Sequence, residues 1–426
     1  MQKIHQHTFA NGLTLLAERM EHVRTAAFSC LVPAGCIYDP PQHLGLASVL
    51  ADLITRGAGP RSSRELTLDL DNLGLDRDES VGALHVRFWG ATLARNLPAA
   101  LEIYADILRR PHLPAEEIDP VRALALQDLQ GLEDEPRQKM MIELRRRHYP
   151  PPLGRDRRGT REGIKALNAK VIQTHYRRLF QPRGTILSVA GNIDWQPLRE
   201  QVERLFGDWE PGTEPALKLG KQPPKRAHIK KETTQTQIGI AYASVPIGHA
   251  DYYPALGAVN VLSGGMSARL FTEVREKRGL CYAVSASYGT FKDRASVLCY
   301  AGTTNERAQE TLDVTLGELV RLQEGIETEE VERVQAGLKS SLIMQEESSS
   351  ARAGTLASDW YYLGRVRSFD EIEAGINALT PKKIVQHLRR YPPSDFTIVT
   401  LGPESLRVKN RLTSAVYGLA RQGAKP

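Results

Sequence analysis

The expected strands and helices follow the same order twice along the chain, and this repeat restricts the fold more than any other feature of the sequence. In the first half, strand-like alternation in TLLAERM and AAFSCLVPAG precedes a helical pattern, further helical segments and the strand Thr185–Ile193. In the second half, the strand Thr236–Pro246 precedes a helix, two strands, further helices and the strand Asp395–Pro403. A repeat of about 200 residues is far longer than the unit of a solenoid, so the order indicates a duplicated domain.

The order of strands, helix, strands, helices and strand also predicts the fold class of each half. We expect an α+β fold of two tandem homologous domains, each with a mostly antiparallel sheet and helices packed on one face. The segment Glu210–His228 is polar, rich in Pro and Gly and free of periodicity, which is typical of an extended linker. We therefore place the N-terminal domain at residues 1–215 and the C-terminal domain at residues 216–426.

Composition and charge exclude several classes of protein. No apolar run approaches the roughly 18–20 residues of a membrane span, and the first residues lack a signal-peptide pattern, so we expect a cytoplasmic protein without a membrane partner. The four cysteines form no CxxC pair and are expected to be buried thiols. Part of the net charge of +6 lies in Arg145–Arg161, which lacks the interleaved aromatic residues of a nucleic-acid site. We interpret this segment as a solvated loop and expect no nucleic-acid partner.

The stretch His43–Gly57 has the apolar spacing of a helix and an unusual polar face. Ser48 and Asp52 are four residues apart and therefore lie on one face of that helix, with Ala51 between them. A zinc protease with the inverted motif requires His, Glu and His at these three places. The stretch therefore has the spacing of an active-site helix but lacks the zinc ligands and the general base.

Several segments together resemble one family of enzymes. NGLTLLAERM, PAGCIYDPPQHLGLASVLADLITRGAG, AGNI and LSGGMSARLFTEVREKRGLCYAVSASY are similar to segments of the insulinase (pitrilysin-type) metallopeptidases. The similarity covers nearly the whole chain, is most specific over Leu262–Tyr288, and is greatest to the short, mitochondrial-processing-peptidase-like branch. In this family the helix carries His-x-x-Glu-His: both histidines bind zinc, and the glutamate activates water.

The resemblance assigns zinc-site positions whose residues here are different. The two histidines are replaced by Ser48 and Asp52, the glutamate by Ala51, and the third ligand, a more distant glutamate, by Asp128. Two carboxylates and a hydroxyl suit a hard cation rather than zinc, and Ala51 leaves no general base. We predict that this chain binds no metal and no cofactor and does not catalyse alone. His5 and His7 have no third ligand nearby in the sequence and are not expected to form a metal site.

The second half retains the other part of the family's active site. The resemblance implies that Arg275 and Tyr282, seven residues apart in REKRGLCY, are the catalytic pair that binds peptide substrate. A guanidinium and a phenol can donate to a substrate carbonyl and to the oxyanion formed during attack. The alternative is a surface arginine at a helix end and a tyrosine packed on the sheet. Gly279 between them permits a turn, across which both side chains are expected to converge.

The resemblance implies a partner, since chains of the short branch pair into a closed chamber. Our leading hypothesis is a non-catalytic subunit of a heterodimeric zinc peptidase, which binds peptides in trans while a homologous subunit carries the zinc. One alternative is a purely structural subunit in which Arg275 and Tyr282 have no function. The other is a homodimer that binds peptides without cutting them.

Overall fold

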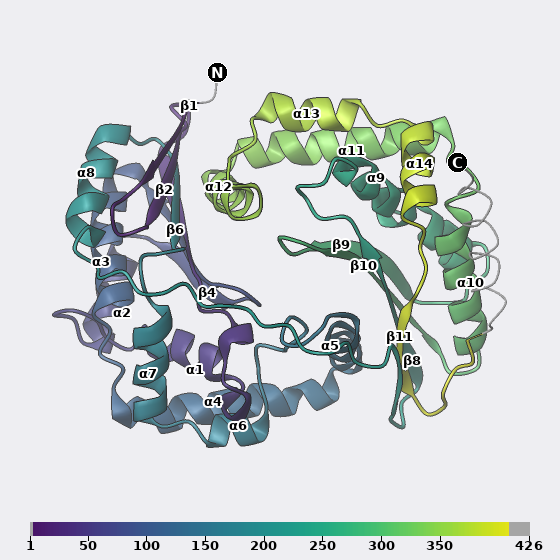
Figure 1. Ribbon diagram of the computed structural model, residues 1–426, viewed down its shortest axis with the longest axis horizontal. Helices are drawn as coiled ribbons and strands as arrows, with labels where there is room; N and C mark the ends of the chain where they lie inside the picture. The colour runs from purple at the N-terminus through teal and green to yellow at the C-terminus, as the bar shows by residue number, and fades with distance from the viewer. Residues whose placement is uncertain (1–2, 409–426) are drawn as a thin grey trace. The chain divides into compact units, whose positions relative to one another are not determined.

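The computed structural model describes residues 3–408 and divides into two compact units (Figure 1). Unit 1 comprises residues Met1–Glu133, Arg155–Gly220 and Met344–Val366, and unit 2 comprises residues Asp134–Gly154, Lys221–Ile343 and the chain from Arg367 onward. Each unit is therefore built from three stretches of the sequence, and one stretch in each comes from the other half of the chain.

Unit 1 contains a six-stranded sheet with the strand order β1-β2-β6-β3-β5-β4. Strands β2 and β6 are parallel, and all other neighbours are antiparallel. The strands are β1 (Lys3–Thr8), β2 (Thr14–Arg19), β3 (Thr25–Val32), β4 (Asp76–Val81), β5 (Val86–Leu93) and β6 (Ile186–Gly191). One face packs on helices α1 (Leu46–Leu53), α2 (Ser63–Asn72), α3 (Leu97–Arg109), α4 (Ile118–Gly131), α7 (Ala169–Leu179) and α8 (Trp195–Phe206), and α6 (Arg161–Lys165) lies beside α4.

Unit 2 contains a five-stranded sheet with the order β7-β11-β8-β10-β9, in which only β7 and β11 are parallel. The strands are β7 (Arg226–Lys230), β8 (Gln235–Ser244), β9 (Ala283–Thr290), β10 (Ala295–Thr304) and β11 (Thr397–Gly402). Helices α9 (Tyr252–Ser263), α10 (Ala308–Arg321), α11 (Thr328–Glu346) and α14 (Pro381–Arg390) share its main core, and α13 (Phe369–Asn377) precedes α14.

The two sheets have the same topology once β1 is set aside. In chain order β2 to β6 correspond to β7 to β11, and this correspondence makes the two strand orders identical, including the single parallel pair. The predicted α+β duplication is confirmed. The expected linker has no helix or strand until β7 begins at Arg226, so its last three residues belong to that strand.

The second face of each sheet is covered by a helix from the other half of the chain, which the sequence did not predict. Helix α5 (Pro136–His148) packs against β8 and β11 of unit 2, and helix α12 (Ser349–Leu363) packs against β2, β3 and β6 of unit 1 (Figure 1). Helix α5 is the third α-helix after β5, and α12 is the third after β10, so the two are equivalent and the exchange is reciprocal. It explains why the central strands β6, β8 and β11 are buried at nearly every residue.

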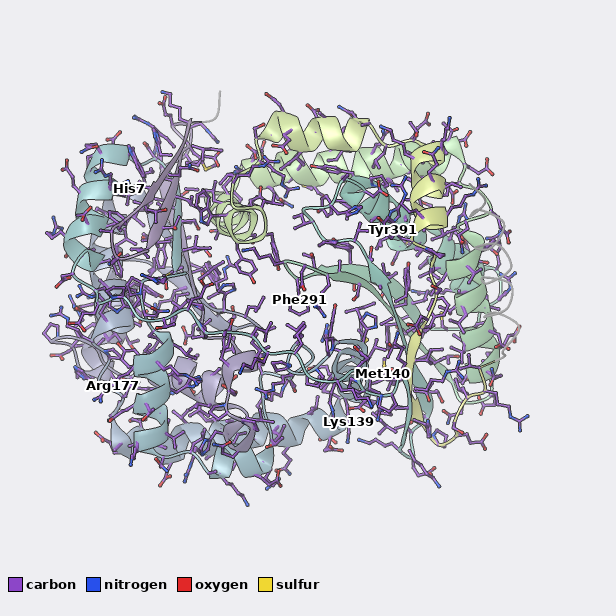
Figure 2. All side chains as sticks on the ribbon, in the orientation of Figure 1. His7, Lys139, Met140, Arg177, Phe291 and Tyr391 are labelled. Atoms are coloured by element: carbon purple, nitrogen blue, oxygen red, sulfur yellow. The ribbon has the colours of Figure 1, made fainter. Side chains whose placement is uncertain are left out.

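Each exchanged helix has its own anchor in the sheet. On α5, Met140 (labelled in Figure 2) is fully buried, and its Sδ lies 2.2 Å from where a Cβ on Gly239 would stand. On α12, the guanidinium of Arg352 is 1% exposed and donates two hydrogen bonds, of 2.8 and 2.6 Å, to the Glu18 carboxylate on β2. Its Nη1 pairs with Oε1 of Glu346 at 2.7 Å.

Candidate functional site

Helix α1 presents the expected polar face, and its other residues belong to the core. Ser48 and Asp52 are its only residues that are not buried, whereas Ala51 is 4% exposed and packs in the core of unit 1. The helix begins after Gly45 because the Asp39 carboxylate accepts hydrogen bonds from the Gly45 and Ala47 amides, at 2.9 and 3.0 Å. Burial raises the pKa of Asp39 to about 7, and these amides act in the opposite direction.

The side chains at the zinc-site positions interact with other groups. The Ser48 hydroxyl donates to the Arg157 carbonyl at 2.7 Å. Asp52 pairs with Arg56 one turn further along, with Oδ1 at 2.9 Å from Nη2. Asp128, which lies on α4, has its Oδ2 3.1 Å from Nε of Arg158.

These residues do not fit zinc. Zinc sites use histidine, cysteine and a limited number of carboxylates in tetrahedral geometry, and this face offers one hydroxyl and two carboxylates already paired with arginines. Burial, followed by the charges of Asp78 and Asp52, raises the pKa of Glu79 on the neighbouring strand β4. Across residues 3–408, no group of three or more His, Cys, Asp or Glu side chains is arranged to hold a metal ion.

The histidines of β1 make aromatic contacts. His5 stacks on Trp195 with ring centroids 5.0 Å apart, and His7 meets Phe9 edge-on at 4.6 Å. Figure 2 labels His7 on this strand. Both imidazoles therefore pack against neighbouring rings.

Arg275 and Tyr282 are brought together in unit 2. Arg275 lies near the end of a π-helix, Phe271–Glu276, and the chain then turns through Gly279, whose φ of +58° suits a residue without a side chain. The Arg275 guanidinium carbon is 5.7 Å from the centre of the Tyr282 ring and 4.9 Å from that of Phe271. Tyr282 is 79% exposed and so does not pack on the sheet. The two donors converge at the surface.

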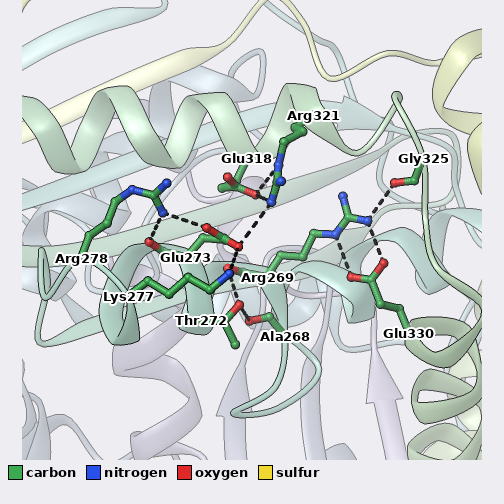
Figure 3. A network of polar contacts seen from close by, with 10 residues as sticks. All are labelled: Ala268, Arg269, Thr272, Glu273, Lys277, Arg278, Glu318, Arg321, Gly325 and Glu330. Atoms are coloured by element: carbon green, nitrogen blue, oxygen red, sulfur yellow. Dashed lines mark hydrogen bonds and ion pairs between the residues drawn. The ribbon is translucent and has the colours of Figure 1, made fainter.

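A network of ion pairs joins the segment that contains the π-helix to α10 and α11 (Figure 3). Arg269 forms a bidentate pair with Glu330, with both distances 2.7 Å. Glu273 accepts hydrogen bonds from Lys277 and Arg278, which lower its pKa to about 2. Oε1 of Glu273 also lies 3.7 Å from Nη2 of Arg321 on α10, so the segment that carries Arg275 is joined to both helices. A pocket of about 190 Å³ lies beside it, lined among others by Asn260, Gly264, Gly265, Ser267, Glu330 and Arg333.

Comparison with known families identifies the chain. The sequence profile described as insulinase (peptidase family M16) matches residues 14–160, and the profile described as the peptidase M16 inactive domain matches residues 166–338. The chain belongs to the M16 family. Both profiles describe parts of one peptidase family; the second begins before β6 of the first sheet and ends within α11.

M16 relatives and solved structures extend over nearly the whole chain. It is 25% identical over 405 residues to an uncharacterised zinc protease of Bacillus subtilis, covering 94% of this chain and 98% of that one. It is 26% identical over 399 residues to an uncharacterised zinc protease of Rickettsia bellii, covering 93% and 97%.

Two solved structures share the M16 fold of this chain. A peptidase M16 inactive domain from Pseudomonas fluorescens superposes with a TM-score of 0.86 at 18% identity, covering 95% of this chain and 99% of that chain. A protease from Helicobacter pylori gives 0.84 at 20% identity, covering 95% and 100%. Within the described residues, no helix has the length and apolar character needed to span a membrane.

The interpretation of Arg145–Arg161 as a solvated loop is right only in part: residues 149–160 form no helix or strand, but some of their side chains face the protein. The first residues of the segment end helix α5, and the Arg155 guanidinium donates to the Ile37 and Asp39 carbonyls at 3.0 and 2.6 Å. Arg158 is also turned inward. Sequence reasoning missed these arginines because a run of basic residues gives no sign of which side chains face the protein.

Proposed function

We propose that this M16 chain is the non-catalytic subunit of a heterodimeric zinc peptidase, in which it binds peptide substrate through Arg275 and Tyr282. A homologous partner carries the zinc and the general base. One contrast carries the proposal: the chemistry of the zinc helix is replaced at Ser48, Ala51 and Asp52, while Arg275 and Tyr282 stay together and exposed. We further propose that the two duplicated domains correspond to residues 1–215 and 216–426, each of which contributes one helix, α5 or α12, to the compact unit built mainly from the other. We also propose that the complex acts in the cytoplasm.

The exposed pair has the chemistry for this role. The phenol of Tyr282 and the guanidinium of Arg275 donate hydrogen bonds to a peptide carbonyl, and more strongly to the negative oxygen that forms when water attacks it. The ion pairs around Arg269 and Glu273 hold the arginine's segment in place before substrate arrives. Fixed donors need little reorganisation during the reaction, and this supports a role in stabilising the transition state.

The test begins with the partner. The chain is purified from its native host under mild conditions, and co-purifying proteins are identified and assayed for zinc. We expect a homologue of similar length with an intact His-x-x-Glu-His motif, and the pair is then reconstituted from separately produced chains. The isolated chain is expected to hydrolyse no peptide.

Variants of the reconstituted pair separate substrate binding from scaffolding. Tyr282→Phe and Arg275→Ala should each lower kcat for peptide cleavage by up to about 100-fold, the typical effect of removing one oxyanion donor, without changing assembly or the partner's zinc content. Arg226→Ala is the matched control, because Arg226 is exposed on β7 at the opposite edge of the same sheet from β9. Unchanged cleavage in both variants would assign the chain to the structural class. If the chain is purified from its host as a dimer of itself, without a zinc-bearing partner, the peptide-binding homodimer would be favoured.

A further inference from the structure

The metal-binding positions of unit 1 retain negative charge, and each carboxylate has an arginine partner. Asp52 pairs with Arg56 on its own helix at 2.9 Å. Asp128 on α4 pairs with Arg158, which comes from the loop that follows residue 154. The side chain of Arg158 is 15% exposed, although that of Asp128 is 56% exposed. The arginine therefore lies deeper than the carboxylate it contacts.

The loop that carries Arg158 is fixed over the start of α1. The Thr160 amide donates to the Leu44 carbonyl at 3.3 Å, and a Cβ on Gly159 would stand 2.1 Å from that same oxygen. The Arg158 carbonyl is 2.8 Å from where a Cβ on Gly45 would lie. Only glycine fits at these two positions, so the loop and the helix meet backbone to backbone.

Two consecutive residues of this loop contact the zinc-site positions on both helices, α1 and α4. The Arg157 carbonyl receives the hydrogen bond from Ser48 on α1, at 2.7 Å. From the next residue, the Arg158 side chain extends to Asp128 on α4, and its Nη1 is also 3.4 Å from Oδ1 of Asp156. A guanidinium thus supplies the positive charge beside Asp128, the position of the third zinc ligand.

We propose that Arg158 is the resident cation of this site and excludes a metal ion even when the ligands are restored. A metal ion beside Asp128 would be repelled by the guanidinium already there, which is 15% exposed and is held by two carboxylates and a fixed loop. The predicted absence of metal binding then has two causes: the ligands are replaced, and the Arg158 guanidinium lies beside Asp128. This inference concerns unit 1 alone and does not depend on the proposed partner.

The test restores the ligands and varies the arginine. A chain with Ser48→His, Asp52→His and Asp128→Glu carries the family's ligand types, while Ala51 is kept because it packs in the core. This triple variant is equilibrated with buffered Zn²⁺, and bound zinc is measured by elemental analysis. We expect weak binding, and the further change Arg158→Ala should raise the zinc affinity at least tenfold. Arg157→Ala is the matched control, because only the backbone of Arg157 is used and its side chain is exposed. Equal zinc affinity with and without Arg158→Ala would overturn the proposal.

A second measurement avoids the triple variant in case it does not fold. In the otherwise unchanged chain, Arg158→Ala leaves the carboxylates of Asp128 and Asp156 without their shared guanidinium. Because carboxylates bind hard divalent cations, this variant should gain a Mn²⁺ site detectable by electron paramagnetic resonance. The unchanged chain and Arg157→Ala should not. The absence of a gain in a variant with a native circular dichroism spectrum would contradict the proposal.

Discussion

The exchanged helix α12 should depend on the ion pair between Arg352 and Glu18. The guanidinium is 1% exposed, the Glu18 side chain is 5% exposed, and two hydrogen bonds of 2.8 and 2.6 Å join them. Arg352→Met keeps much of the side-chain length but leaves the Glu18 carboxylate buried without its partner. Removing one member of a buried pair typically costs about 3–5 kcal/mol, because the remaining charge stays out of water. We expect a loss of that size in the free energy of unfolding of unit 1.

The assay is urea unfolding followed by circular dichroism, with hydrogen exchange to show which strands lose protection. The loss should fall on β2, β3 and β6, against which α12 packs. The double change Glu18→Leu with Arg352→Met should recover most of it, because the buried Glu18 charge is removed with its partner and Glu346, which also loses Arg352, is 21% exposed. Asp119→Ala is the control: its pair with Arg122 is at the surface, and its loss should cost less than about 1 kcal/mol. The reasoning is refuted if Arg352→Met unfolds at the same urea concentration as the unchanged chain, or if the double change is no better than the single one.

Two further predictions concern the anchors of α5. Nδ1 and Nε2 of His148 lie 3.0 and 2.6 Å from the hydroxyls of Thr397 and Ser296, and burial lowers its pKa to about 4. Since the unfolded pKa is about 6.5, the stabilisation should be complete above pH 6.5 and lost as the pH falls toward 4. His148→Asn should lower the urea midpoint at pH 7.5 and make stability fall less as the pH is lowered. If the variant and the unchanged chain lose stability in parallel between pH 6.5 and 4, the prediction is contradicted. Gly239→Ala places a methyl group against Met140 and should cost about 1–3 kcal/mol by overpacking, measured by thermal unfolding. In a Met140→Ala background the same change should cost less, because the methyl group then has room, and an equal loss in both backgrounds would show that the contact is not responsible.

The sequence predicts the duplication and the meeting of Arg275 with Tyr282 because both depend on local order. Strand and helix periodicities repeat along the chain, and Gly279 marks the turn that brings the pair together. Such patterns describe each element by itself. They predict that a helix has an apolar side, but they do not identify the sheet that this side will cover.

Local sequence patterns therefore cannot predict the exchange of α5 and α12, nor the contacts of Arg158. Met140 and Leu144 are one helical turn apart, a spacing that fits either sheet equally well. The sequence of β6, apolar except for Ser188, indicates burial on both faces. It does not indicate that the helix covering the second face comes from more than 150 residues later in the chain. For Arg158, the sequence shows only one more basic residue in a charged segment, and its inward direction depends on the backbone contact at Gly159.

The reciprocal exchange also governs how the protein is made. While the ribosome is still producing the second half, the first sheet has its strands but lacks the helix that covers Leu16, Ala27 and Ile186. Its apolar face stays open until residues 349–363 have been synthesised, and open apolar sheet faces are prone to aggregation. For the second sheet the order of synthesis is reversed, because α5 is made before any of the strands that it will cover. Neither half is complete without the other, so the duplicated gene encodes one inseparable chain rather than two domains joined end to end.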